Sequence, residues 1–152
     1  AAKLLVAAAA GVALAVLALG VAFLIGEVWV GELGVGSDEL QVAGRIIVAG
    51  ALWAIVGIGL GGVLRSQVGA IVAAFVWFLI AEPLVTAQLE SVGEYFPGNA
   101  MERFVGMEQL RSTQGLADEP ELGLGAATVL VGFYAAAAAA VGTAVVRSRD
   151  VA

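Results

Sequence analysis

Glu82 is the one acidic residue deep inside an apolar segment of this sequence, within the run AFVWFLIAEPLVTAQL. A carboxylate in an apolar membrane helix is costly, so it faces protein or water and is a functional candidate by default. Pro83 follows it directly. Because a proline has no N–H and its ring clashes with the preceding turn, we expect the helix to kink there. Glu82 and Pro83 are therefore the candidates for a transport path or a kink.

Two roles for Glu82 stay open at this point. As a structural group, it would accept hydrogen bonds from amides freed by Pro83, or pair with Arg45 near the outer surface. As a functional group, it would carry protons, although the spans contain no second acidic or basic residue and proton relays use several. Counted from Val68 at 1.5 Å per residue, Glu82 lies about 20 Å from the inner boundary of the bilayer.

Other kinds of site chemistry are excluded by composition. The chain has no histidine and no cysteine, which removes disulfides, thiolate chemistry, histidine acid–base catalysis and most transition-metal sites. We expect no cofactor and no enzymatic activity, because no nucleophile–base pair or metal-ligand cluster can be found. The net charge of −6 argues against a nucleic-acid partner.

Four apolar segments must position these residues. They cover residues 4–26, 46–64, 68–89 and 124–146, each about 19 to 23 residues long, against the ~20 that a helix needs to cross a bilayer. Hydrophobic residues make up 61% of the chain, charged residues 13%, and the mean hydropathy is +1.01. Strands that alternate apolar and polar residues, as a membrane barrel requires, are absent from the sequence. The prediction for residues 1–152 is an all-α, polytopic bundle in a lipid bilayer.

Basic residues at the span ends predict the topology. They are Lys3, Arg65, Arg147 and Arg149. The opposite loops, residues 27–44 and 90–123, are rich in acidic residues. By the positive-inside rule, the four basic residues are cytoplasmic anchors. We therefore expect a plasma-membrane protein with both termini in the cytoplasm.

The second outer loop is too long for a simple connection. Within it, Asn99 and Glu102 resemble a capping box, and Met101, Phe104 and Val105 give the helix that would follow an apolar side. We expect a short helix lying at the outer membrane surface, with a disordered acidic loop as the alternative.

Small residues recur at four-residue spacing in two of the spans. Gly57 and Gly61 form a G-x-x-x-G pair, and Gly132 and Ala136 repeat the spacing in the last span. Such rows let helix backbones approach closely in lipid. They predict helix packing, either within the chain or at a dimer seam.

The order of these features resembles the membrane subunits of type-2 ATP-binding-cassette (ABC) exporters. The sequence GIGLGGVLRSQVGAIVAAFVWFLIAEPLV is similar to their glycine-rich span, short basic turn and span ending in Glu-Pro-Leu. The opening AAKLLVAAAAGVALAV, the stretch Tyr95-Phe96-Pro97-Gly98 and the closing VRSRDVA resemble their third span, last outer loop and tail. The resemblance covers nearly the whole chain as spans three to six, so we expect N-terminal spans to be missing.

The resemblance implies a permease half that pairs with a second permease half and with separate ABC ATPase subunits. It also implies that the span 68–89 lines the substrate path and that the following loop folds over the outer exit. The sequence itself has no G-x-x-x-x-G-K-[ST] phosphate loop, so ATP hydrolysis is expected in another subunit. The alternatives are a non-transporting membrane scaffold or accessory subunit, and an ion-coupled carrier that uses Glu82.

Overall fold

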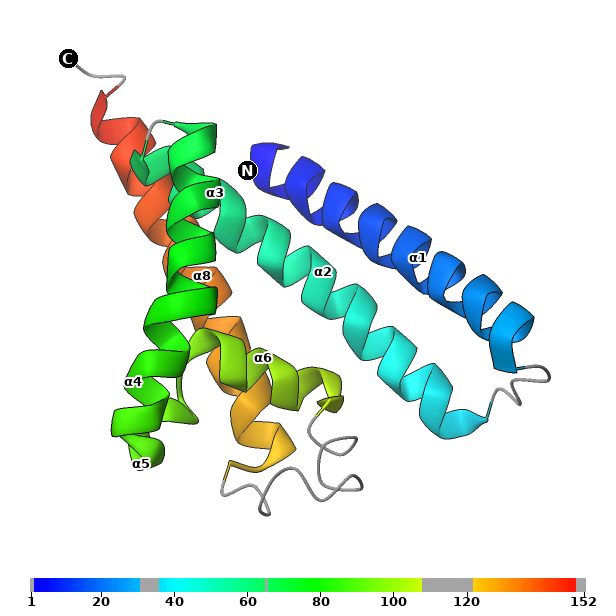
Figure 1. The fold of residues 1–152 in the computed structure, drawn as a ribbon. Helices are drawn as coiled ribbons and strands as arrows, with labels where there is room; N and C mark the ends of the chain where they lie inside the picture. Colours follow the sequence, from blue (N-terminus) through cyan, green and yellow to red (C-terminus); the bar gives the residue numbers. More distant parts are fainter. Residues whose placement is uncertain (1, 31–35, 65, 108–121, 150–152) are drawn as a thin grey trace.

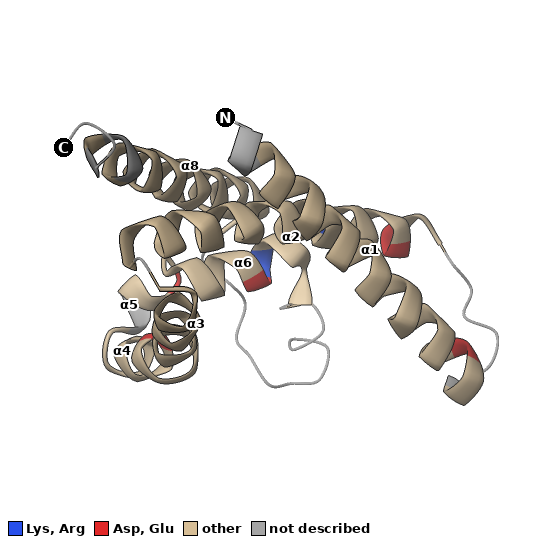
Figure 2. Cartoon of the chain, turned by 90° about the horizontal axis from the view of Figure 1, so that it is seen from above, with Lys and Arg blue, Asp and Glu red and all other residues tan. Residues whose placement is uncertain are grey.

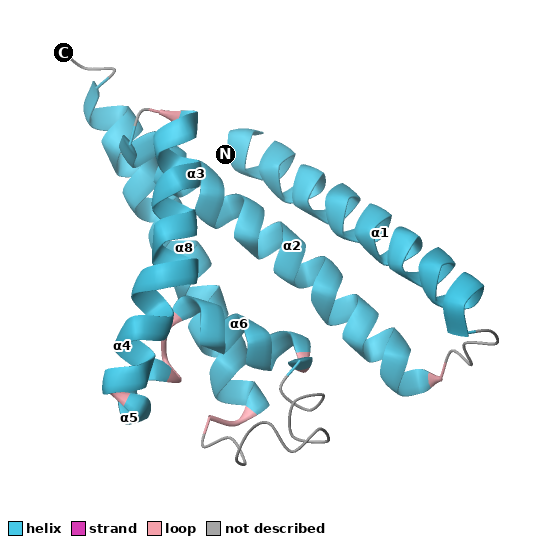
Figure 3. Ribbon diagram, in the orientation of Figure 1, coloured by secondary structure: helices cyan, strands magenta, loops and turns pink. Residues whose placement is uncertain are grey.

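The computed structural model describes residues 2–30, 36–64, 66–107 and 122–149. Every regular element in these ranges is a helix, which confirms the predicted all-α fold (Figure 3). The third span is divided by a short π-helix, η1. In chain order the elements are α1 (Ala2–Val30), α2 (Ser37–Leu64), α3 (Gln67–Val76), η1 (Trp77–Ala81), α4 (Glu82–Gln88), α5 (Glu90–Gly93), α6 (Pro97–Val105) and α8 (Leu124–Arg149).

Four stretches are long and apolar enough to cross a bilayer. They are Leu5–Trp29, Ser37–Leu64, Gln67–Gln88 and Leu124–Val145, and they overlap the four predicted spans. Their outward faces carry exposed large apolar side chains such as Leu14, Phe75 and Val129. Charged residues are sparse along the described helices (Figure 2). Apolar surface on this scale requires lipid to cover it, so the chain is a multi-pass membrane protein.

Helix α2 lies at the centre of the bundle. It packs against α1 on one side and against α8 on another, and it also contacts α3 and α6 (Figure 1). The turn into α3 is closed by Ser66, whose Oγ accepts a hydrogen bond of 3.0 Å from the backbone N–H of Gly69. This side-chain cap satisfies one of the otherwise unbonded amides at the start of α3.

Glycine residues let helix backbones touch at two places. Between α1 and α2, a Cβ on Gly50 would lie 2.8 Å from the carbonyl oxygen of Gly11. Between α2 and α8, a Cβ on Gly59 would collide with the carbonyl oxygen of Ala138, and one on Gly142 would lie 2.7 Å from the Cα of Gly59. In lipid, where packing rather than hydrophobic burial drives association, such close approach stabilises the helix pairs.

The small residues that the sequence singled out lie outside these contacts. A Cβ added to Gly57, Gly61 or Gly132 would meet no atom within 4 Å, and Ala136 is exposed. At about 100° per residue, Gly59 points to nearly the opposite side of α2 from Gly57 and Gly61. Within the described part of the chain, the close contact between α2 and α8 therefore uses Gly59. A role for the four predicted small residues in packing between two chains stays a prediction.

The buried core joins α6 to the long helices. It contains Ala49 of α2, Ala100, Met101 and Phe104 of α6, and Val131 of α8. The predicted short helix and its apolar side are thereby confirmed for Met101 and Phe104. Ala49 lies about 18 Å along α2 from its first residue, Ser37. Helix α6 thus packs against the sides of α2 and α8, and its position at the outer membrane surface stays a prediction.

Candidate functional site

The third span changes its helical geometry immediately before Pro83. Helix α3 gives way to η1, in which the backbone N–H of Glu82 bonds to the carbonyl oxygen of Trp77, five residues earlier. Pro83 then falls in the first turn of α4. A proline is tolerated there, because its missing N–H would have had no partner within α4. The irregularity expected at Pro83 therefore takes the form of a π turn.

The carboxylate of Glu82 is buried, with 4% of the residue exposed. Its Oε1 accepts a hydrogen bond of 2.9 Å from the backbone N–H of Asn99, and its Oε2 accepts one of 3.1 Å from Nε1 of Trp77. The Asn99 amide belongs to the first turn of α6, where helical N–H groups have no partner within the helix. Glu82 therefore caps the start of α6 from a different helix.

The alternative pairing of Glu82 with Arg45 is wrong. Glu82 forms no ion pair with any lysine or arginine in the described ranges. Arg45 lies at the other end of α6, where its Nη1 is 3.8 Å from the position that a Cβ on Gly106 would occupy. The two groups are thus separated by the length of α6. An anion at the N-terminus and a cation at the C-terminus both complement the helix dipole, each typically by about 0.3–1 kcal/mol.

Asn99 ties three short helices together. Besides its backbone bond to Glu82, its Nδ2 donates to Oγ1 of Thr86 at 3.2 Å and to the carbonyl oxygen of Gly93 at 2.8 Å. The predicted capping box is wrong, because α6 begins earlier, at Pro97, and its N-cap Phe96 makes no side-chain cap. Asn99 is already inside the helix. We call Trp77, Glu82, Thr86 and Asn99 the Glu82 bracket.

Further hydrogen bonds fasten this segment to α8 and to the residues before it. The Tyr134 hydroxyl donates to the carbonyl oxygen of Tyr95 at 2.6 Å. Arg103 donates from Nη1 to the carbonyl oxygen of Leu122 at 2.8 Å, and its Nη2 lies 3.8 Å from Oε2 of Glu94. Irregular backbone alongside membrane spans is stable only where protein satisfies its polar groups. These bonds provide that for the turns around α5 and α6.

The hydrogen bonds of the bracket join neighbouring helices. A cavity of about 460 Å³ adjoins Glu82, Thr86 and Asn99. Both carboxylate oxygens already accept hydrogen bonds, and the described residues contain no group of three metal-binding side chains. The bracket holds α4, α5 and α6 in one arrangement, which makes it a device for positioning this part of the third span.

The remaining predicted site residues stand apart from the bracket. Lys3 is in the first turn of α1, and Arg147 and Arg149 are in the last turn of α8, so three of the four anchors lie at helix ends. Arg65 lies outside the described residues, as does the acidic part of the outer loop, residues 108–121.

Sequence reasoning missed the two donors to Glu82, which are Trp77 and Asn99, and the hydrogen bond from Asn99 to Thr86. One signal was present, since a buried indole N–H normally finds a hydrogen-bond partner and Trp77 lies five residues before Glu82. Asn99 carried no comparable signal, because its partner is 17 residues away.

Comparison with known proteins assigns no relative, since no family model, curated protein or solved structure matches the chain.

Proposed function

We propose that this chain belongs to the membrane-spanning permease subunit of an ATP-driven ABC exporter, and that it contributes to the substrate path while a separate subunit hydrolyses ATP. The observation that carries the proposal is the order of elements around the bracket. A glycine-rich span, α2, is followed two residues later by a third span, which is interrupted at Glu82-Pro83. The short helices α5 and α6 come next, and α6 packs back against α2 and α8.

This arrangement supports the resemblance in the segment that follows the third span. In the exporter family, the loop after the fifth span is expected to fold over the outer exit. Here the corresponding segment is held by the Glu82 bracket and by the hydrogen bond between Tyr134 and Tyr95. A third span joined to such a segment can move with it as one unit, which suits a path that opens and closes.

An ion-coupled carrier is supported less well by the same geometry. A proton carrier needs a carboxyl that can release its proton into a path with further titratable groups. Glu82 is buried, and each of its carboxylate oxygens accepts a hydrogen bond from a backbone or indole N–H, groups that do not titrate. Its position favours a structural role in α6.

The proposed assembly has further parts. A second permease half, identical or different, would complete the path, and the ATPase subunits would dock at the side of the membrane that carries the basic anchors. That side is the cytoplasm under the positive-inside rule, and the membrane would be the plasma membrane.

The test is to purify the whole subunit, with an affinity tag, from its own cells in mild detergent and to reconstitute it in liposomes. We expect an ATPase subunit with a G-x-x-x-x-G-K-[ST] loop to co-purify with it, and the complex to hydrolyse ATP. Replacing the lysine of that loop should abolish hydrolysis while the complex still assembles. Purification with no ATPase subunit and no ATP hydrolysis would refute the proposal. Proton-driven uptake that disappears in Glu82→Gln would support the carrier instead.

A further inference from the structure

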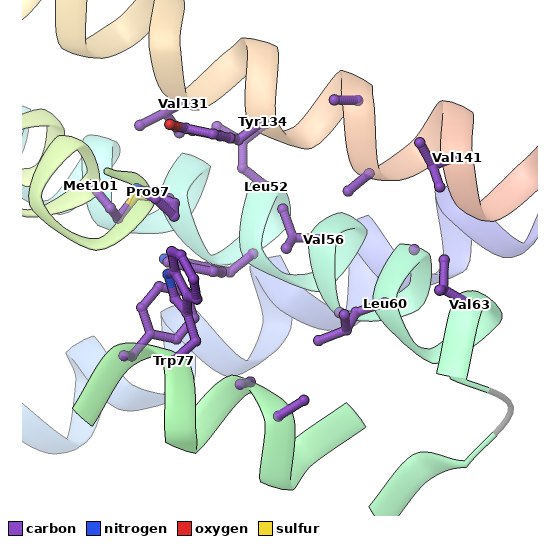
Figure 4. A pocket seen from close by; sticks show the side chains of 18 residues that line it. Leu52, Val56, Leu60, Val63, Trp77, Pro97, Met101, Val131, Tyr134 and Val141 are labelled. Carbon is purple, nitrogen blue, oxygen red and sulfur yellow. The ribbon is translucent and has the colours of Figure 1, made fainter. Parts of the chain in front are cut away.

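An apolar cavity of about 690 Å³ lies between α2, α3 and α8 (Figure 4). Leu52, Val56 and Leu60 of α2 form one wall, and Val131 and Val141 of α8 form another. The wall from α3 is made of small residues and of the aromatic side chains that follow them in η1. The volume is within the range of ~300–1,000 Å³ that is typical of small-molecule sites.

The cavity extends through about half of the membrane. At one end it is closed by Pro97 and Met101 of α6, and at the other it reaches Val63 and Val141. Between Leu52 and Val63, α2 rises about 16 Å, against a hydrocarbon core of ~30 Å. A spanning helix, from this protein or from a second copy, needs the full thickness and would meet α6. A chain that reaches from one surface to the bilayer centre fits the space.

Two of the polar side-chain groups in the lining, those of Trp77 and Tyr134, are already bonded, and the indole of Trp53 also lines the cavity, with its ring edge-on to Phe78. Nε1 of Trp77 donates to Glu82, and the hydroxyl of Tyr134 donates to the carbonyl oxygen of Tyr95. No charged side chain lines the cavity among the described residues. A polar ligand would therefore lose most of its hydrogen bonds to water, because the Trp53 indole N–H could replace only one of them.

The same cavity is unfavourable when it is empty. Water is not stable in an apolar space, and unfilled walls lose their dispersion contacts. Two of the lining residues, Trp77 and Val141, are 41% and 53% exposed, so the space can be reached from the surrounding lipid.

We infer that this cavity is a binding site for the acyl chain of a membrane lipid from the leaflet next to the α2–α3 turn. The methyl end of the chain lies against Pro97 and Met101, and the headgroup stays at the membrane surface beyond Val63. The inference goes beyond the proposed function and does not depend on it, because a scaffold with this fold would hold the lipid as well.

The test uses photo-crosslinking of the whole subunit in phosphatidylcholine vesicles. A phosphatidylcholine with a diazirine near the methyl end of one acyl chain is included, and crosslinked residues are identified by mass spectrometry after illumination. We expect crosslinks at Val131 and Tyr134, which line the cavity. Exposed Val129 serves as the reference for ordinary lipid contact.

Two matched variants decide the result. Gly57 lines the cavity and Gly61 does not, and a side chain at either position would meet open space, so both leucine variants should fold. Gly57→Leu should lose most of the crosslinking at Val131 and Tyr134, whereas Gly61→Leu should keep it. Labelling of Val129 without labelling of these two residues would overturn the inference, because the acyl chain would then stay outside the cavity. Equal crosslinking in the two variants would overturn it too.

Discussion

Replacement of Glu82 by glutamine separates the charge of the bracket from its shape. The carboxylate accepts from two donors, the Asn99 N–H at 2.9 Å and the Trp77 Nε1–H at 3.1 Å. Hydrogen bonds to a charged group contribute about 1.5–3 kcal/mol each. Glutamine has a single accepting oxygen, so its NH₂ group must face the second donor. We therefore expect Glu82→Gln to lower the free energy of unfolding by about 1.5–3 kcal/mol, and Glu82→Leu, which leaves both donors unbonded, by about 3–6 kcal/mol.

A double-mutant cycle tests whether the indole is the donor that causes this loss. Trp77→Phe removes the Nε1–H, so in that background the glutamine NH₂ no longer faces a donor. The cost of Glu82→Gln should then fall by at least about 1 kcal/mol, as expected for residues in direct contact. The measurement is equilibrium unfolding of the whole subunit in mixed micelles, followed by circular dichroism. Glu27→Gln, at an exposed position of α1, is the matched control and should change stability little.

The reasoning fails if Glu82→Gln is as stable as the parent protein, because the two hydrogen bonds would then have no measurable value. It fails equally if the glutamine costs the same in both backgrounds, since the indole would then not be its partner.

The other predictions concern packing and topology. Gly59→Ala places a Cβ against the backbone of α8, whereas the Cβ of Gly61→Ala meets open space. Both variants gain the same helix propensity, so the difference between them measures the contact alone. Gly59→Ala should therefore be less stable than Gly61→Ala by about 1–3 kcal/mol in the same unfolding assay. Equal stability of the two would contradict the close contact. Gly98→Ala puts a Cβ 2.6 Å from Oε1 of the bracket carboxylate and should lower the melting temperature; no change would mean that the carboxylate can move aside. Ser66→Cys should resist a membrane-impermeant thiol reagent in intact cells and Ser112→Cys should react, and the reverse pattern would invert the topology.

The fold class could be predicted from the sequence because the bilayer imposes a length on apolar segments. A run of about 20 apolar residues without breaks is stable in lipid as an α-helix. The four spans could therefore be located from the length of the apolar runs. The short helix α6 was also predicted, since Met101 and Phe104 have helical spacing. Its neighbours α2 and α8 were not, because spacing indicates which side is apolar and not which helices will cover it.

The details of packing could not be predicted for a physical reason. In a soluble helix, polar residues mark the face that turns away from its neighbours, but α2 is apolar on all sides after its first turns. Gly57, Gly59 and Gly61 were therefore equivalent by sequence, and only the crossing of α8 selects Gly59. The pairing of Glu82 with Arg45 was wrong because sequence does not show how α6 lies between the spans. Glu82 lies at the start of α6 and Arg45 lies near its end.

The bracket also has a consequence for the order in which the chain is synthesised. Glu82 and Asn99 are 17 residues apart, so α4, α5 and α6 can bond to one another soon after they leave the ribosome. The hydrogen bond between Tyr134 and Tyr95 spans 39 residues and must wait for α8. Contacts of short sequence separation form first, because they close the smallest loops. The Asn99 amide at the start of α6 can thus be satisfied before α8 is made, and α8 then packs against a segment that is already joined.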